Sequence, residues 1–203
     1  MARFIPGLKL SELFYKEAVK PILDSEFPQL RYSAALIDSG SEVLGFDTPQ
    51  SRDHHWGPRL LLFLPKADCR EKQEKILTVL ARRLPSTFHG YSTHFGEPDE
   101  EGVQLLRKVK NGEPINHRVD VSTIESFFQG YFGINPDDKI NELDWLIFSE
   151  QKLRTIRSGR VFHDGLELNK IRRKLKYYPK DVWLYLLACQ WHRIEQQEPS
   201  MVE

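Results

Sequence analysis

Two short uninterrupted apolar runs constrain the fold of this chain more than any other feature of its sequence. They occupy residues 34–37 and 60–64 and read AALI and LLLFL. The first run ends in the polar turn residues 38–41, and the second ends at Pro65. Apolar runs of this length, bounded by turn residues, are typical of buried strands.

A third strand is predicted over residues 117–124, where Val119 and Val121 alternate with Arg118 and Asp120. Helical periodicity fills most of the remaining chain, and after residue 124 it is the dominant pattern. The predicted helices cover residues 8–22, 66–84, 123–132, 149–158, 166–177 and 179–196.

We therefore expect an α+β fold with two parts. Residues 1–124 are predicted to form a small mixed sheet with flanking helices, and residues 125–203 a helical region. Residues 163–165 are interpreted as a turn in which Asp164 acts as a cap. The aromatic and apolar residues of the last helix are expected to lie in the core; they are Trp183, Tyr185, Leu187 and Trp191.

The charge balance argues against several classes of partner. Lys plus Arg and Asp plus Glu both total 29 in 203 residues, so no overall field attracts nucleic acid or anionic membrane. Charged residues interrupt the apolar runs near the N-terminus, and no window approaches the length of a membrane span. We expect a cytoplasmic protein with no membrane partner. Residues 152–176 carry nine basic residues against two acidic ones; solvated helix faces explain this stretch, although it leaves a nucleic-acid substrate open.

The polar turn after the first run offers the parts of a phosphate site. Gly40 allows the backbone to approach phosphate oxygens, and Ser39 and Ser41 add hydroxyl groups beside the N–H groups of the turn. Turns of this kind also occur in α/β proteins that bind no ligand. The turn alone is therefore weak evidence for phosphate binding.

A polar cluster before the second run contains candidate metal ligands. Asp53 and His55 are two residues apart, so in an extended segment their side chains share one face and can share a cation, while His54 faces the other way. The alternative is that Asp53 caps a turn and that both histidines bind local carbonyl groups.

Asp120 is the third candidate ligand, because it stands on the polar face of a strand whose other face carries Val119 and Val121. The alternative for Asp120 is a salt bridge to Arg118 or Arg59. Mg²⁺ prefers oxygen ligands, whereas a histidine ligand favours Mn²⁺ or a softer metal.

Taken together, these segments resemble the DNA polymerase beta superfamily of nucleotidyltransferases. In that superfamily, a Gly-Ser pair after the first strand is followed by two carboxylates one residue apart and by a third carboxylate on a later strand. Residues 34–58, AALIDSGSEVLGFDTPQSRDHHWGP, more closely resemble a bacterial family of unknown function that is related to aminoglycoside nucleotidyltransferases. The likeness continues in residues 117–121, 161–165 and 177–191 and spans most of the chain.

The resemblance implies a role for each matching residue. Residues 39–41 hold the triphosphate, Asp53 is the first metal ligand, His55 stands at the place of the second, and Asp120 is the third carboxylate or the base that activates the acceptor hydroxyl. Asp53 and Asp120 are thus the expected catalytic residues. Two departures stand out: His55 replaces an acid, and proteins of this family usually continue into a longer helical region. The resemblance therefore leads us to expect a fragment or a short relative.

The expected function is metal-dependent transfer of a nucleoside monophosphate from ATP, or another nucleoside triphosphate, to a hydroxyl of a small molecule or protein. Mg²⁺ or Mn²⁺ is the expected cofactor. A first alternative, which His55 favours, is a catalytically inactive module on the same scaffold that senses nucleotide or binds protein. A second is a metal-dependent hydrolase or nuclease that uses Asp53, His54 and His55 directly.

Overall fold

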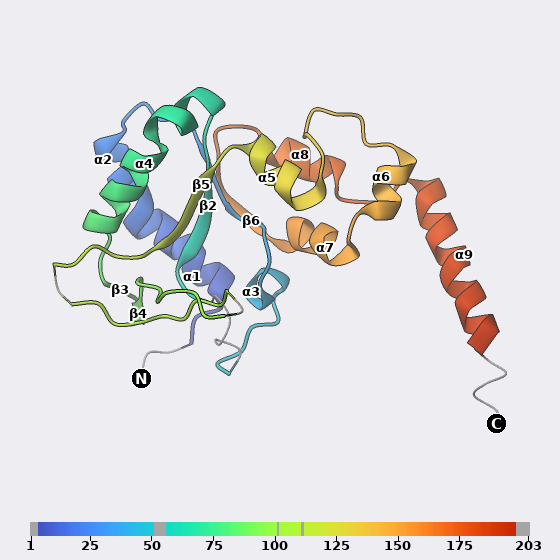
Figure 1. The fold of residues 1–203 in the computed structure, drawn as a ribbon, viewed down its shortest axis with the longest axis horizontal. Helices are drawn as coiled ribbons and strands as arrows, with labels where there is room; N and C mark the ends of the chain where they lie inside the picture. The colour runs from blue at the N-terminus through green and yellow to red at the C-terminus, as the bar shows by residue number, and fades with distance from the viewer. Residues whose placement is uncertain (1–3, 51–55, 101, 111, 198–203) are drawn as a thin grey trace.

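The computed structural model confirms the expected α+β fold, built on a small mixed sheet (Figure 1). It describes residues 4–50, 56–100, 102–110 and 112–197. Within them the sheet contains β1 (Ser33–Leu36), β2 (Arg59–Phe63), β5 (Arg118–Ser122) and β6 (Arg160–Asp164), in the spatial order β5-β2-β1-β6. β1 is antiparallel to both neighbours, whereas β2 and β5 are parallel. A separate short hairpin pairs β3 (Thr87–Phe88) with β4 (Tyr91–Ser92).

The central strand β2 is apolar at successive positions because its two faces enter two different cores. Leu60 and Leu62 lie in a first core, and Leu61 and Phe63 lie in a second core on the opposite face. A strand that is covered on both faces needs apolar side chains throughout. Arg59, at the start of β2, is the exception, and it too is buried.

The first core is covered by the N-terminal helical segment and by α4 (Lys66–Arg83) (Figure 1). Where the sequence predicts a single helix, α1 (Gly7–Phe14), the π-helical turn η1 (Tyr15–Val19) and α2 (Lys20–Glu26) follow one another without interruption. Pro21 has no N–H to donate to the preceding turn, and its ring crowds the carbonyl there. This accounts for the locally wider helix before Pro21.

The second core is covered by the helices that follow β5. They are α5 (Ile124–Phe132), α6 (Glu142–Ile147), α7 (Glu150–Ser158) and α8 (Leu168–Lys174). Helix α6 is not predicted from the sequence, because it lies in an acidic stretch. Asn141 starts it: its side-chain oxygen accepts from the backbone N–H groups of Leu143 and Asp144 at 2.9 and 3.0 Å. The Asp144 carboxylate accepts from the Asn141 N–H at 2.8 Å and completes a capping box.

The interpretation of residues 163–165 as a turn is wrong for the first two residues, while Gly165 is in a turn. His163 and Asp164 lie in β6, which pairs with β1. Asp164 nevertheless acts as a cap, because its two carboxylate oxygens accept from the backbone N–H groups of Leu168 and Asn169 at 2.6 and 3.1 Å. The boundary between two parts of the chain at residue 124 stays a prediction. β6 follows residue 124 in the chain but belongs to the same sheet as β1, β2 and β5.

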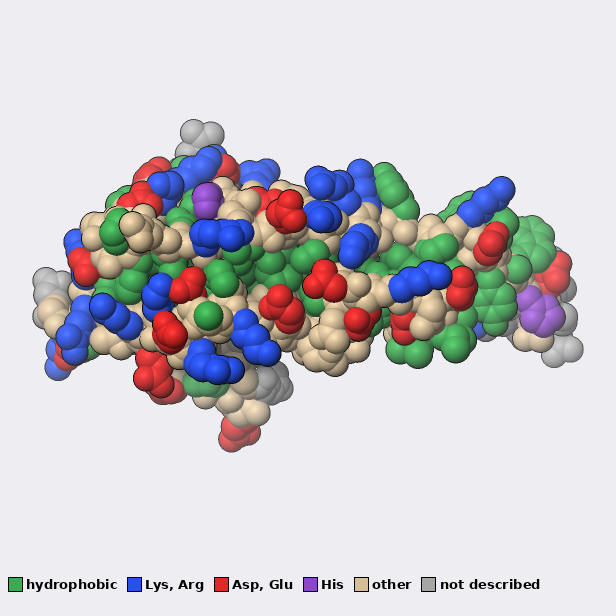
Figure 2. All heavy atoms as spheres, turned by 90° about the horizontal axis from the view of Figure 1, so that it is seen from above, with side chains coloured by type: hydrophobic (Ala, Val, Ile, Leu, Met, Phe, Trp, Pro, Cys, Tyr) green, Lys and Arg blue, Asp and Glu red, His purple; other side chains and the backbone are tan. Residues whose placement is uncertain are grey.

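The terminal helix α9 (Lys180–Gln197) extends away from the sheet (Figure 1), and apolar side chains lie open at that end of the molecule (Figure 2). The expectation that its aromatic residues lie in the core is wrong: Trp183 and Trp191 are 50% and 66% exposed. Val182 at its start is buried and joins the second core. No helix among the described residues is both long and apolar enough to cross a membrane.

Candidate functional site

Three strand ends meet at one edge of the sheet, and the candidate site lies there. Ala35 of β1 pairs with Leu61 of β2, and Arg59 at the start of β2 pairs with Arg118 at the start of β5. Because β1 runs opposite to β2, the chain leaves β1 at the edge where β2 and β5 begin. The turn after β1 therefore lies at the end of the sheet where β5 begins, two residues before Asp120.

The turn at residues 39–41 follows β1 and leads into the short helix α3 (Ser41–Leu44). Gly40 has a φ of 143°, a conformation that residues with a side chain rarely adopt. A Cβ at this position would lie 2.6 Å from Nη2 of Arg59 and would overlap the carboxylate of Glu42. Gly40 is therefore required both by the backbone conformation and by the close packing around the turn.

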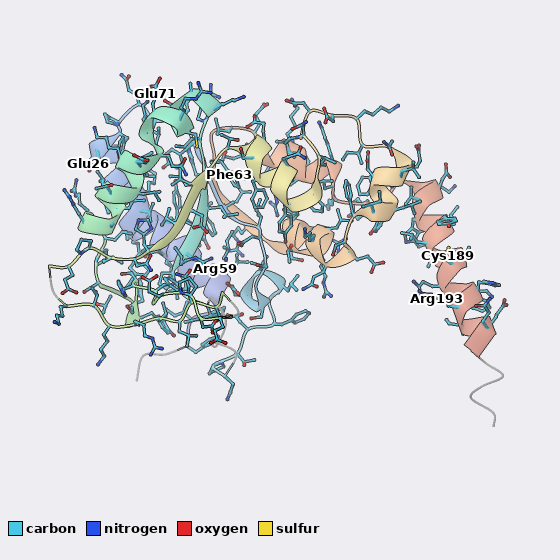
Figure 3. All side chains as sticks on the ribbon, in the orientation of Figure 1. Glu26, Arg59, Phe63, Glu71, Cys189 and Arg193 are labelled. Carbon is cyan, nitrogen blue, oxygen red and sulfur yellow. The ribbon has the colours of Figure 1, made fainter. Side chains whose placement is uncertain are left out.

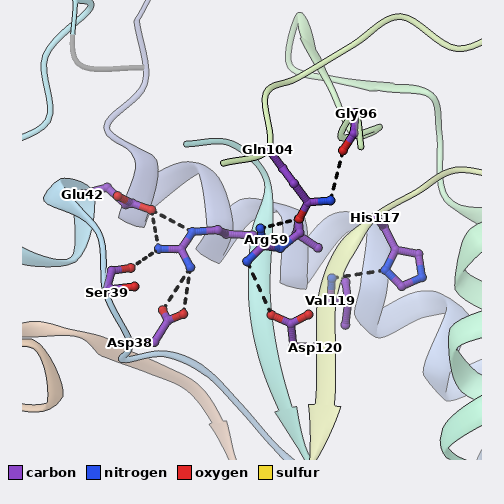
Figure 4. A network of polar contacts seen from close by, with 10 residues as sticks. Asp38, Ser39, Glu42, Arg59, Gly96, Gln104, His117, Val119 and Asp120 are labelled. Atoms are coloured by element: carbon purple, nitrogen blue, oxygen red, sulfur yellow. Dashed lines mark hydrogen bonds and ion pairs between the residues drawn. The ribbon is translucent and has the colours of Figure 1, made fainter. Parts of the chain in front are cut away.

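Arg59 holds this turn from the start of β2 (Figure 4). Its Nη1 donates to both carboxylate oxygens of Asp38 at 3.1 and 3.0 Å, and its Nη2 donates to the carbonyl oxygen of Ser39 at 2.5 Å. Its Nε and Nη2 both donate to Oε1 of Glu42, at 2.9 and 2.7 Å. Figure 3 shows Arg59 at the α3 end of β2, with Phe63 farther along the same strand.

The Arg59 network is charged and almost fully enclosed. The side chains of Arg59 and Glu42 are 4% and 2% exposed, and that of Asp38 is 17% exposed. Burial acts to lower the pKa of Arg59, but Asp38 and Glu42 act in the opposite direction and leave the pKa above its ordinary value. The guanidinium therefore stays charged, and its planar donors fix the backbone of the turn.

Asp120 is the third of the five residues of β5, beside Leu61 of β2, and its side chain is 55% exposed. The salt bridge to Arg118, the alternative to a metal-binding role, is present at 3.9 Å between Nη2 of Arg118 and Oδ2 of Asp120. A nearer partner of Arg118 is Gln104, whose Oε1 accepts from Nη1 at 2.7 Å (Figure 4). Arg59, the other partner in that alternative, forms its ion pairs with Asp38 and Glu42. Asp120 thus presents a largely open carboxylate.

The other predicted metal ligands, Asp53 and His55, lie outside the described residues, as does His54. Within the described ranges, no group of three His, Cys, Asp or Glu side chains is placed to hold a metal ion. Trp56, directly after this segment, is buried and donates from Nε1 to Asp47 at 3.0 Å. A metal site at this edge therefore stays a prediction that requires residues 51–55.

Sequence reasoning missed the structural roles of Asp38, Glu42 and Arg59. The available signal was a lone arginine at the start of an otherwise apolar strand. A buried arginine needs carboxylate or carbonyl partners, and the polar residues after β1 supply both. The pattern alone does not reveal which carboxylates it binds, because Asp120 is an equally available partner by sequence.

Comparison with known protein families gives a match only for the C-terminal part of the chain. Residues 145–203 match the model of a family described as Domain of unknown function (DUF4037). The matched segment begins within α6 and contains α7, β6, α8 and α9, so it lies outside the turn at residues 39–41 and Asp120. Neither a curated protein nor a solved structure matches the chain.

Proposed function

We propose that the turn at residues 39–41 and Asp120 belong to a nucleotidyl-transfer site. The reaction transfers a nucleoside monophosphate from ATP, or another nucleoside triphosphate, to a hydroxyl of a small molecule or protein and releases pyrophosphate. The observation that carries this proposal is that the glycine turn lies at the end of the sheet where β5 begins, and that β5 carries an open carboxylate two residues from its start. The resemblance of residues 34–58 to nucleotidyltransferases supplies the reaction class.

The geometry of the turn supports phosphate binding. Ser39 is exposed, so its hydroxyl and the turn around it are open to a phosphate oxygen. Arg59 makes the turn rigid, since it binds residues on both sides of Gly40. A preformed turn needs little reorganisation when a charged ligand arrives.

Asp120 is assigned to the metal or to the acceptor hydroxyl. Its carboxylate is open and only distantly paired, so it can coordinate a cation or accept a proton. Asp53 and His55 complete the ligand set that the resemblance implies. A bound Mg²⁺ or Mn²⁺ would supply positive charge that offsets the charge of the triphosphate and its leaving group.

The test is transfer from α-labelled ATP to acceptors in a cell extract, with Mg²⁺ or Mn²⁺. We expect Asp53→Ala and Asp120→Asn each to abolish labelling while thermal unfolding stays unchanged. Glu71→Gln is the matched control, because Glu71 is an exposed acid on α4, on the other side of the sheet (Figure 3). Undiminished transfer by Asp53→Ala or Asp120→Asn would disprove the proposal.

The second candidate is a nucleotide-sensing or protein-binding module that has lost transfer activity. The observation that favours it is His55, which stands where the resemblance expects an acid. Calorimetry with ATP and Mn²⁺, combined with an assay of pyrophosphate release, separates the two functions, since a sensor binds nucleotide without turnover. Transfer by the His55→Asp variant, but not by the unchanged chain, would show that His55 has removed transfer activity and would support the second candidate.

A further inference from the structure

A cavity of about 570 Å³ lies among α6, α7 and the start of α9, and the residues of the turn at 39–41 do not line it. Its lining combines buried apolar side chains, Trp145, Leu153 and Leu175, with two exposed aromatic rings, Tyr177 and Trp183. Its volume falls within the range of roughly 300–1,000 Å³ that is usual for small-molecule sites. The cavity thus offers apolar and aromatic side chains to a ligand that carries a planar ring.

The rim of this cavity is strongly basic. Arg154, Arg157, Lys176 and Lys180 line it, against one carboxylate, Glu150. All four basic side chains belong to exposed residues, and within the described ranges none of them forms an ion pair. Four cations around one apolar hollow repel one another and favour an anionic ligand.

A second hollow of about 230 Å³ continues this basic surface. It shares Arg157 and Lys176 with the cavity and adds Arg172 and Arg173. The guanidinium of Arg172 is already bound to carbonyl oxygens at the end of α7, including those of Ile156 and Gly159. Arg157, Arg173 and Lys176 are therefore the groups that face a ligand in this hollow.

We propose that the two hollows form one binding site for a nucleotide, with the base against the rings of Tyr177 and Trp183 and the phosphate at Arg157 and Lys176. An aromatic ring stacks on a base irrespective of its identity, and arginine binds phosphate through parallel N–H donors. The nucleotide is either free or an exposed nucleotide of a single-stranded nucleic acid, since both present a base beside a phosphate. This inference does not rest on the proposed transfer reaction.

The test is calorimetric titration of the full chain with AMP in EDTA, so that no divalent metal contributes. Adenosine and inorganic phosphate are titrated separately and are each expected to bind at least about tenfold more weakly than AMP, because each engages only half of the site. A hexamer of adenylate is the second probe. If the hexamer binds more tightly than AMP and its affinity falls steeply with salt, the ligand is single-stranded nucleic acid. If the hexamer and AMP bind with equal affinity, the ligand is the free nucleotide.

Matched variants locate the site. The double variant Arg157→Gln/Lys176→Gln and the single variant Trp183→Leu are each expected to weaken AMP binding at least about tenfold. Lys170→Gln, which removes a charge from α8 outside both hollows, is expected to leave it unchanged.

Asp120→Asn separates this site from the proposed transfer site, since it should abolish transfer and leave AMP binding in EDTA intact. The inference would be overturned by any of three results: no binding of AMP, binding of inorganic phosphate with the same affinity as AMP, or unchanged AMP binding in the double variant.

Discussion

Arg59 and Glu42 form a buried ion pair in which two guanidinium nitrogens share one carboxylate oxygen, at 2.9 and 2.7 Å. The pair joins the start of β2 to α3, and between these elements lies the turn that carries the candidate phosphate site. Since both side chains are almost completely enclosed, neither charge can be hydrated if its partner is removed.

Replacing Arg59 by methionine is expected to lower the free energy of unfolding by about 3–5 kcal/mol, because Glu42 is left as an unpaired buried charge. Urea denaturation followed by circular dichroism measures the loss. Arg70→Met is the control, since Arg70 is exposed on α4, and its replacement is expected to change stability by less than about 0.5 kcal/mol. Equal stability of the two variants would contradict the assigned role of Arg59.

Gly40→Ala is expected to destabilise the turn by more than the cost of its unusual backbone conformation, which is about 1–3 kcal/mol. The added Cβ meets Arg59 and Glu42 as well. Gly45→Ala is a suitable comparison, because Gly45 also has a positive φ, of 75°, but nothing lies within 4 Å of the added Cβ. Denaturation midpoints of both variants measure the difference, and an equal loss would show that Arg59 and Glu42 yield to the new methyl group.

His117 is expected to make stability depend on pH. Burial lowers its pKa, although its bond to the carbonyl of Leu77, at 3.1 Å, acts in the opposite direction. The other ring nitrogen, Nδ1, accepts from the backbone N–H of Val119 at 3.2 Å, which requires a neutral ring.

Because its folded pKa lies below the unfolded value of about 6.5, the unfolded chain binds the proton more readily. The contribution of His117 to the free energy of unfolding is fully present above the unfolded pKa. It is lost as the pH falls through the folded pKa. Urea denaturation between pH 5 and pH 8 should show a fall in stability at the acidic end, and His117→Gln should reduce its slope by up to one proton. An unchanged slope would mean that another group causes the dependence.

Much of the central sheet was predictable from local pattern. The runs that contain Ala34 and Leu60 mark β1 and β2 to within one residue, because a strand covered on both faces has apolar side chains throughout. Val119 and Val121 are buried and Asp120 is exposed, as their alternation predicts. β6 escaped prediction because it is an edge strand with half-exposed and polar residues, which look like a turn.

The candidate site was predictable only in part. Residue type identifies Gly40 as a turn residue. Asp120 is identifiable as an exposed position because it alternates with Val119 and Val121 along one strand. The partners of Arg59 were not predictable, since side chains at Asp38, Glu42 and Asp120 are equivalent by sequence. Only the antiparallel pairing of β1 and β2 places the first two around the guanidinium and leaves Asp120 open.

The sequence by itself determined the α+β fold class, the central strands and the glycine turn, because these follow from periodicity and residue type within a few positions. The tertiary structure decided which distant residues meet: the ion pair of Arg59 with Glu42, the addition of β6 to the sheet, and the basic cavity between α7 and α9. Contacts of this kind depend on strand order and helix packing, and no local pattern encodes either.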